Sequence, residues 1–371
     1  MRTKIFTVLA LLLAAVAGCD NASPDEKAPS SCEQGPAVMP AATRYIYMSP
    51  AGSDENPGTE AAPVSTLNRV QGILQNERPD SLVVVRIRSD AGAYCGQSVV
   101  WNYLKPDRDI IFEAWPDSIL ASFCRGDADT VFFVLKASAG RATNVHLRRL
   151  FVQGYRAGAI WFTGEAGDES GWNGSNSITD CVMEDIGNAS QPEGHIAWSV
   201  IDLVNSRHNL IRNCSFVDCA NANTNDFPQG GGARAPAEGS NQPIIGVYLA
   251  HHSSCNQITG CTFRRVKGDA VRIRDDSNEN EISNCSFYQT GWTAVCTMWY
   301  QYPQPFLGGG ECPSWNNLFH HNHAEGNWLC GEALLFHDMS TEPARRCPRP
   351  ADGRAYRIRM WANESLPCNR P

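Results

Sequence analysis

The sequence predicts an all-β fold: a single-stranded, right-handed parallel β-helix, or solenoid, with a capping helix at its N-terminal end. Two observations predict it. An eight-residue pattern recurs along the chain, and a short strand of alternating apolar residues precedes most of its copies. A unit that cannot bury its apolar face alone must stack on its neighbours, and self-similarity of this kind is the signature of a solenoid. We therefore expect one elongated domain.

The eight-residue pattern starts with Asn and carries Ile, Cys and Phe at its third, sixth and eighth positions. Its clearest copies are 209–216, 256–263 and 280–287, with weaker ones at 176–183 and 316–323 and a degenerate one near Leu147. The step from Ile258 to Ile282, and from Val271 to Val295, is 24 residues, which suits a coil of three strands and three turns. Coils stacked at about 4.8 Å should align Ile, Asn, Cys and Phe in columns. The alternative, an antiparallel sandwich, lacks most of its hairpin signals.

The N-terminus has the pattern of an export signal. Two basic residues precede an apolar run from Ile5 to Ala17, which is too short to span a bilayer. The ending Val-Ala-Gly-Cys resembles the lipobox of bacterial lipoproteins, which implies cleavage after a signal peptide of residues 1–18 and a lipid on Cys19. A plain signal peptide with a chance cysteine is the alternative.

Downstream of Cys19, the composition separates a linker from a folded domain. Residues 19–42 are rich in Ser, Pro and Ala and should form a flexible tether. Residues 43–371 should form the β-helix domain. We therefore expect an exported monomer, attached through its lipid alone to the inner or outer membrane of the bacterial envelope.

Charge and cysteine content limit the partners. The net charge of −8 gives no global basic field, so we expect no nucleic-acid partner. Fifteen cysteines, Cys19 among them, fit an oxidising compartment in which disulfides persist. Those that recur in the repeat can instead serve as small buried apolar groups. The cysteine spacing does not match a zinc site.

The start of the predicted domain carries a family resemblance. Residues 45–54, Tyr-Ile-Tyr-Met-Ser-Pro-Ala-Gly-Ser-Asp, are followed by Asn-Pro-Gly-Thr at 56–59 and by Pro63. This stretch resembles the N-terminal end of right-handed parallel β-helix proteins of the pectate-lyase-like superfamily. That superfamily includes lyases, hydrolases, epimerases, esterases and non-catalytic binders, so the resemblance implies a carbohydrate-active protein without defining its reaction.

The resemblance also implies a capping helix, and residues 65–74 fit one. Ser65 or Thr66 would be its N-cap. Leu67, Val70 and Leu74 have helical spacing and would share one face. Such a cap would protect the strand edges of the first coil from aggregation.

Residues between the core positions should face outward and form a grid along one sheet. In successive coils this grid would hold Trp161, Asp202, Tyr248, Arg272 with Arg274, Met298 and His337, with His251, His252, Asp275 and Asp276 just past the strand ends. Such a trough suits a polysaccharide lying along the axis. Insertions at 221–243 and 299–316 should wall it, and Trp299 and Tyr300 in the second could stack on sugar rings. Packing of these rings against the helix is the alternative.

Five cations lie between Arg264 and Arg274, against a single acid, Asp269. Because Arg binds carboxylates bidentately, this patch favours an acidic glycan. In polysaccharide lyases of the superfamily an Arg or Lys often serves as the base beside a uronate carboxylate. The resemblance therefore implies Arg272 or Arg274 as the base and Lys267 as a neutralising cation.

Three carboxylates near these cations leave further alternatives. Asp202, Asp275 and Asp276 could hold calcium, which prefers oxygen ligands, or Asp202 could pair with either of the others for glycoside hydrolysis. The Asn-Thr-Asp and Gly-His-Gly motifs of the superfamily's polygalacturonases are absent. A ladder of ion pairs through residues 272–276 is the structural alternative.

These observations support three hypotheses on function. The first is a polysaccharide lyase that acts on an acidic glycan by β-elimination. The second is a non-catalytic glycan-binding or envelope-structural lipoprotein with the same trough. The third is a β-helix protein that interacts with other envelope proteins.

Overall fold

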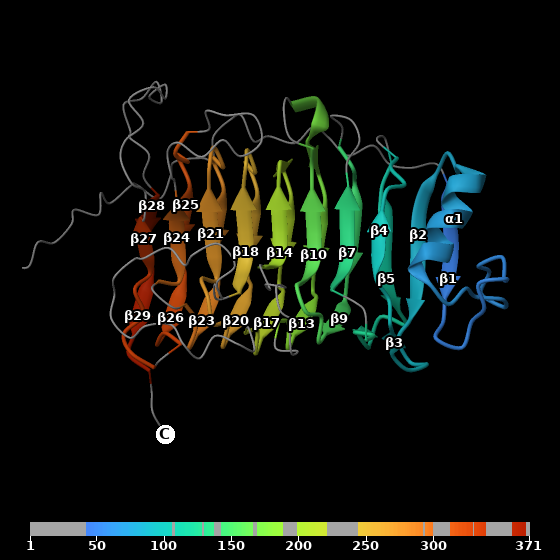
Figure 1. Ribbon diagram of the computed structural model, residues 1–371, viewed down its shortest axis with the longest axis horizontal. Helices are drawn as coiled ribbons and strands as arrows, with labels where there is room; N and C mark the ends of the chain where they lie inside the picture. The colour runs from blue at the N-terminus through green and yellow to red at the C-terminus, as the bar shows by residue number, and fades with distance from the viewer. Residues whose placement is uncertain are drawn as a thin grey trace, which may run out of the picture.

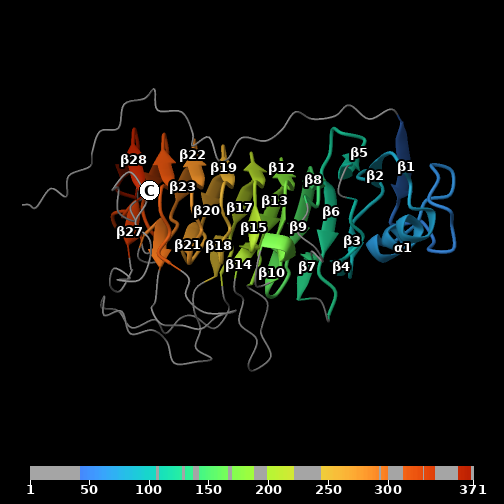
Figure 2. The ribbon, with the colours of Figure 1, turned by 90° about the horizontal axis from the view of Figure 1, so that it is seen from above.

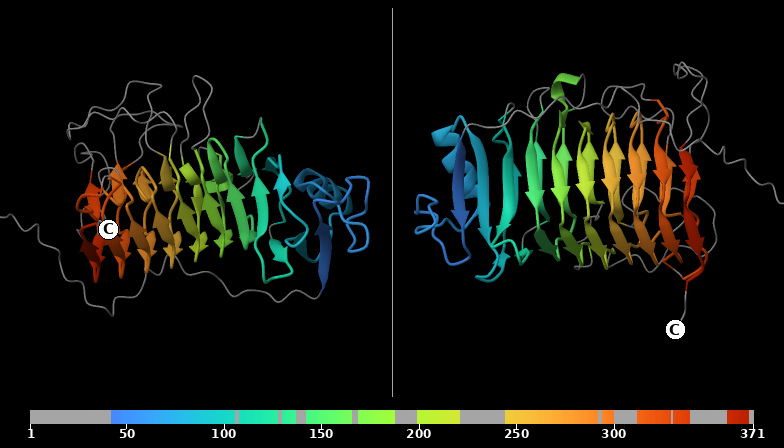
Figure 3. Two further views of the ribbon diagram at one scale, coloured as in Figure 1. Left: turned by 90° about the horizontal axis from the view of Figure 1, so that it is seen from below. Right: turned by 180° about the vertical axis from the view of Figure 1, so that it is seen from behind.

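The computed structural model describes residues 42–105, 108–127, 130–136, 142–165, 169–187, 199–220, 244–291, 294–299, 312–328, 330–338 and 358–368. They form a parallel β-helix, and the predicted fold class is confirmed. Figure 1 shows the coils stacked along the long axis from the N-terminal end in blue to the C-terminal end in red, and Figure 3 shows the same stack from two other sides. All strand pairs within the described part of the chain are parallel.

Three long sheets make the walls, counted over the described residues. Sheet A has ten strands, in the order β1 (Thr43–Met48), β2 (Leu82–Arg88), β5 (Ile110–Trp115), β8 (Val145–Arg148), β12 (Ser177–Thr179), β16 (Leu210–Arg212), β19 (Gln257–Thr259), β22 (Glu281–Ser283), β25 (Leu318–His320) and β28 (Arg359–Trp361). Sheet B has nine, in the order β3 (Tyr94–Cys95), β6 (Ala121–Cys124), β9 (Leu150–Gln153), β13 (Val182–Glu184), β17 (Ser215–Val217), β20 (Thr262–Arg264), β23 (Ser286–Tyr288), β26 (His323–Glu325) and β29 (Glu364–Leu366).

Sheet C carries the predicted grid. Its eight described strands run in the order β4 (Val99–Trp101), β7 (Val131–Lys136), β10 (Gly158–Thr163), β14 (Ser199–Val204), β18 (Ile245–Ala250), β21 (Val271–Arg274), β24 (Cys296–Trp299) and β27 (Phe336–Asp338). A short 3-10 helix, η2 (Glu169–Gly171), and a two-stranded sheet of β11 (Asn173–Gly174) and β15 (Ser206–Arg207) lie between sheets C and A in the coil order.

The repeated Ile and Phe positions stack in register inside the helix. Ile211 pairs with Ile258, which pairs with Ile282. The ring of Phe263 lies between those of Phe216 and Phe287, with centroids 4.3 and 5.2 Å away. Each of these side chains is buried, and full burial of such a residue stabilises the fold by about 1.5–3 kcal/mol before entropy is subtracted. The predicted columns are confirmed.

The Asn that starts each repeat forms a buried hydrogen-bonded column between sheets C and A. The Oδ1 atom of Asn256 accepts from both the backbone and side-chain nitrogens of Asn209, at 2.9 and 2.8 Å. The same contacts link Asn176, Asn209, Asn256, Asn280 and Asn317 in turn. Because these donors and acceptors are paired from coil to coil, their hydrogen bonds offset the cost of removing them from water. Asn213 and Asn284, at the next bend, have a left-handed φ of 54°, which Asn tolerates better than most residues.

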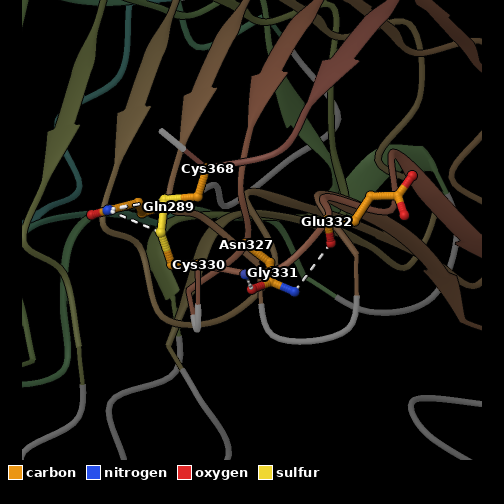
Figure 4. Close-up of a disulfide and its surroundings, with 6 residues drawn as sticks. All are labelled: Gln289, Asn327, Cys330, Gly331, Glu332 and Cys368. Atoms are coloured by element: carbon orange, nitrogen blue, oxygen red, sulfur yellow. Dashed lines mark hydrogen bonds between the residues drawn. A yellow bond between two sulfur atoms is a disulfide. The ribbon is translucent and has the colours of Figure 1, made fainter. Parts of the chain in front are cut away.

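The cysteines divide into buried thiols and disulfides. The recurrent thiols are free and buried; they are Cys181, Cys214, Cys261 and Cys285. Cys330 and Cys368 form a disulfide beside the side-chain amide of Gln289, as Figure 4 shows. A second disulfide joins Cys95 and Cys124 on adjacent strands of sheet B.

The first coil is covered by the predicted capping helix. This helix, α1, spans Leu67–Glu77, and the Thr66 Oγ1 atom accepts from the backbone N–H of Arg69 at 3.1 Å. Its buried face includes Leu67, Val70 and Leu74, as the spacing predicts. Figure 2 shows α1 at the end of the solenoid opposite the last coil. No helix in the described residues is both long and apolar enough to cross a membrane.

One predicted register is wrong. Val271 pairs with Cys296, not with Val295, because β24 begins one residue later than the repeat predicts. Met298 therefore lies opposite Ile273 and is 1% exposed, and Thr297 takes the outward position in its place. The predictions on residues 1–41, which include the signal peptide, Cys19 and most of the tether, lie outside the described residues.

Candidate functional site

The outward residues of sheet C form one continuous row. Adjacent strands are paired in register through Val100, Val134, Trp161, Asp202, Tyr248, Arg272, Thr297 and His337. Apart from Met298, the sequence assigned each predicted member to its correct place. The row is therefore a ladder of side chains along the helix axis, and its polar members are concentrated on strands β14 to β27.

Asp202 is the most unusual member of this row. Its side chain is 8% exposed, and its Oδ1 atom is buried without a hydrogen-bond partner in the described part of the chain. Burial raises the pKa of this carboxyl to about 7, and His251 acts in the opposite direction. A buried charge without a partner is costly, so the carboxyl takes up a proton instead. Near neutral pH, Asp202 can therefore both donate and accept a proton.

Two aromatic residues flank Asp202 in the row. The Trp161 indole N–H donates to the Ser199 carbonyl at 3.2 Å, which fixes the ring beside β14. Tyr248 is 3% exposed and packs in a small apolar cluster with Ile245 and Ala250, outside the main core. Burial raises the pKa of the Tyr248 hydroxyl, so this group stays protonated. As a substrate-binding residue, Tyr248 is far less exposed than the prediction implied.

The two arginines predicted as candidate bases are held in ion pairs. The Nη2 atom of Arg272 lies 2.6 Å from Oδ2 of Asp269, which also accepts from the Thr297 hydroxyl at 2.6 Å. Arg274 lies 3.0 Å from Asp275 and donates to the Tyr248 hydroxyl at 3.3 Å. An arginine guanidinium carries N–H donors and no acceptor atom, and here each one is engaged by a carboxylate. These contacts are the ion-pair alternative considered above, and they argue against either arginine acting as a base.

Lys267 lies at the other end of β21 from Arg274, because it precedes the strand that Arg274 ends. Its side chain is 6% exposed, and burial lowers the pKa of its amine. The Nζ atom lies 5.8 Å from the centroid of the Trp328 ring, a cation–π contact. The structure therefore does not bring Lys267 and Arg274 together as a base and a neutralising cation.

His251 and the remaining acids occupy the bend that follows sheet C. His251, Asp275 and Asp276 have left-handed φ values of 52°, 42° and 53°. Asp275 is engaged by Arg274, and the Oδ2 atom of Asp276 accepts from the backbone N–H of Cys312 at 2.7 Å. Across the described residues, no group of three or more His, Cys, Asp or Glu side chains is arranged to hold a metal ion. Calcium binding by Asp202, Asp275 and Asp276 stays a prediction.

The other predicted binding residues lie at the C-terminal end of the row. Trp299 is the last residue of β24, where it pairs with Arg274. His337 follows Thr297 in the row, and its Nδ1 atom is buried without a hydrogen-bond partner in the described residues. Tyr300 and the insertion 221–243 lie outside the described residues.

Two polar groups of this site were missed. Asp269 and Thr297 join Arg272 in one buried network, yet neither was proposed as a site residue. Asp269 could have been identified from the sequence, because it is the one acid among five nearby cations. Thr297 could not, since its place in the row depends on the one-residue shift of β24.

The fold and this row define a parallel β-helix protein with a buried, proton-active carboxyl group on the outer face of one sheet. No protein-family model and no curated protein matches the sequence. Among solved structures, the chain is similar to a rhamnogalacturonan lyase, with 15% identity, a TM-score of 0.45, and coverage of 86% of this chain and 87% of that one.

Two further solved structures are similar over most of their length. One is titled 1,3-α-1,4-β-D-galactose-4-sulfate-3,6-anhydro-D-galactose-2-sulfate 4 galactohydrolase, with 10% identity, a TM-score of 0.47, and coverage of 94% of this chain and 93% of that one. The other is an alginate lyase from Paenibacillus sp. str. FPU-7, with 11% identity, a TM-score of 0.38, and coverage of 88% and 99%.

Proposed function

We propose that the protein acts on an acidic polysaccharide that lies along the outward row of sheet C, and that Asp202 transfers the proton. The observation that carries this proposal is the Asp202 carboxyl, which is buried in the row, has one oxygen without a hydrogen-bond partner among the described residues, and has a pKa raised to about 7. A pKa near the working pH is what efficient general acid–base catalysis needs. Perturbed carboxyls of this kind are typical of functional sites.

The reaction that best suits these groups is β-elimination. A base takes the proton from the carbon next to the uronate carboxylate, a carbon–carbon double bond forms, and the glycosidic C–O bond to the leaving sugar breaks. The leaving oxygen then takes up a proton. Asp202 would serve in its ionised form as the base, or in its protonated form as the acid. Arg272 and Arg274 would orient the substrate carboxylate through their positive charge.

Non-catalytic glycan binding is the second candidate. It is favoured by the ion pairs of Arg272 and Arg274, which leave no arginine of the row as a base. In this case the row would bind the polymer, and Asp202 would donate a hydrogen bond from its protonated form. Both candidate functions involve binding of an acidic polysaccharide, but only the first converts it to product.

The remaining parts of the proposal concern the cell and the cofactor. We propose an exported, monomeric lipoprotein anchored through Cys19 to the bacterial envelope, with the membrane contacted through the lipid alone. Labelling with a radioactive or clickable fatty acid, compared between the wild type and Cys19→Ala, tests the anchor. Comparing turnover in added calcium with turnover in a chelator tests whether the predicted calcium site exists.

Turnover on a panel of acidic glycans tests the proposed reaction. Alginate, pectate and glycosaminoglycans are incubated with the protein, and the ultraviolet absorbance of the unsaturated product is followed. The test variant is Asp202→Asn, which keeps the size of the side chain and removes its titration. The matched control is Asp218→Asn, which changes an acid in the bend just after β17 of sheet B, away from the row. Product from the wild type and the control, but not from Asp202→Asn, supports elimination. Binding without product favours the second candidate, and absence of both rejects the proposal.

A further inference from the structure

Sheet A carries a second outward row that no part of the proposed function uses. Its in-register members, from the N-terminal end, are Tyr47, Arg86, Glu113, Arg148, Thr179, Arg212, Thr259, Ser283, His320 and Trp361. The residue that precedes each arginine of the row is buried, as the alternation of a strand requires; these residues are Val85, Leu147 and Ile211. The row therefore runs the length of the solenoid on a different wall from Asp202.

The row carries three arginines on alternate strands of the sheet. Arg86, Arg148 and Arg212 lie on β2, β8 and β16, which are separated by β5 and β12. With about 4.8 Å between strands, successive arginines repeat about every 9.6 Å along the axis. That repeat is comparable to the length of two linked pyranose units.

None of these three arginines forms an ion pair in the described part of the chain. The acid near Arg148, Asp109, is bonded to His146 at 3.3 Å. Arg86 instead lies over aromatic rings, 4.5 Å from the centroid of Tyr45. Arg212 is exposed. In a protein with a net charge of −8, these unneutralised cations in one row are available to an anionic partner.

Aromatic rings lie at both ends of the row. At the N-terminal end, the rings of Tyr47 and Trp115 meet edge to face with centroids 5.6 Å apart. At the C-terminal end, His320 stacks on Trp361 with centroids 4.2 Å apart. Aromatic ring faces can stack on sugar rings, and arginine guanidinium groups can pair with their acidic substituents.

We propose that this row binds a linear anionic polysaccharide with one carboxylate or sulfate for every two sugar units. The arginines would pair with the charged units. Glu113 lies between Arg86 and Arg148 in the row and forms no ion pair with either in the described structure, so it would face an uncharged unit and accept hydrogen bonds from its hydroxyls. The same carboxylate disfavours a polymer that is charged on every unit, because like charges would then meet.

Binding to three polymers tests this proposal. The probes are immobilised hyaluronate, with one carboxylate per two sugars, polygalacturonate, with one per sugar, and neutral dextran. We expect the wild type to bind hyaluronate more tightly than polygalacturonate, and not to bind dextran. Asp202→Asn should bind hyaluronate as the wild type does, so the result is independent of the proposed reaction.

Substitutions in the row identify the residues responsible. An exposed ion pair contributes about 0.5 kcal/mol, or about a twofold change in affinity, so Arg212→Gln should weaken hyaluronate binding about twofold. The triple variant Arg86→Gln, Arg148→Gln, Arg212→Gln should weaken it by about tenfold, because it removes all three contacts. The matched control is Arg78→Gln, an exposed arginine at the C-terminal end of α1, which should leave the affinity unchanged.

Glu113→Gln tests the charge spacing. It should raise the affinity for polygalacturonate about twofold and leave hyaluronate binding unchanged, because only the fully charged polymer meets Glu113 with a carboxylate. The proposal is overturned if the triple variant, shown to melt like the wild type, binds hyaluronate normally. It is also overturned if dextran, or single-stranded DNA of equal charge, binds as tightly as hyaluronate.

Discussion

The outer faces of sheets C and A both carry arginines, but the two sets differ in whether carboxylates pair with them in the described structure. On sheet C, Arg272 and Arg274 are held by Asp269 and Asp275, and the buried carboxyl of Asp202 has an oxygen without a hydrogen-bond partner in the described residues. On sheet A, the arginines of the row have no carboxylate partners in the described structure, and Arg212 is exposed. The same stack of coils therefore carries two surfaces that differ in charge. Internal neutralisation of the cations on sheet C leaves a carboxyl as the reactive group, whereas unneutralised cations on sheet A favour binding.

The largest expected effect concerns turnover at sheet C. Asp202→Asn should lower kcat by about 10²–10⁴-fold, because it removes general acid–base catalysis. Arg212→Gln on sheet A should leave the turnover of short oligosaccharides unchanged. Steady-state rates of product absorbance measure both. Equal losses of turnover in the two variants would show that the outer faces of sheets C and A do not differ in function.

The next effect concerns the stability of the buried network. Asp269→Asn should lower the free energy of unfolding by about 3–5 kcal/mol, because it leaves the Arg272 charge buried without its partner. The double variant Asp269→Asn, Arg272→Met should recover most of this loss, since it removes the uncompensated charge. Urea unfolding followed by circular dichroism measures both. A single variant as stable as the wild type would show that Asp269 does not neutralise Arg272.

Asp202 should make the stability depend on pH. Its folded-state pKa of about 7 lies above the value of 3.8 for an unperturbed Asp, so the folded state holds a proton that the unfolded chain releases above about pH 4. The free energy of unfolding should therefore fall as the pH rises from about 4 to 7, by up to about 4 kcal/mol. Asp202→Asn should remove this part of the slope and be the more stable protein at pH 7. Urea unfolding of both proteins across this range measures the difference, and parallel pH profiles would contradict the shift.

The smallest effect is expected on sheet A. Arg212→Gln should change the free energy of unfolding by less than about 0.5 kcal/mol, because an exposed side chain without an ion pair contributes little to stability. The same urea experiment measures it. A loss of several kcal/mol would show that Arg212 has a structural partner, and it would weaken the binding proposal.

The coils and the cap could be predicted because they depend on local, repeated patterns. Ile258 and Ile282, or Phe263 and Phe287, recur at a fixed spacing, and the structure pairs them in register. The prediction failed at Thr297, where β24 begins one residue later than the repeat indicates. A one-residue shift exchanges the inner and outer faces of a strand, so a small error in a turn misplaces every side chain of that strand.

The chemical state of the site could be predicted only in part. The sequence identified the outward row and offered ion pairing of Arg272 and Arg274 as an alternative, which the structure contains. The raised pKa of Asp202 depends on burial by segments distant in the sequence, and no spacing encodes it. The arginine row of sheet A was missed because Arg86 precedes the first copy of the repeat and Arg148 lies in a degenerate copy, so the pattern does not align them clearly.

The central claim is that sheet C presents a carboxyl that gains and loses its proton near neutral pH. The most direct test is an NMR titration of protein labelled with ¹³C at the Asp side-chain carboxyls, with the Asp202 signal assigned by its loss in Asp202→Asn. We predict that this signal titrates with a pKa of about 7. A midpoint near 4, as for an exposed Asp, would contradict the account.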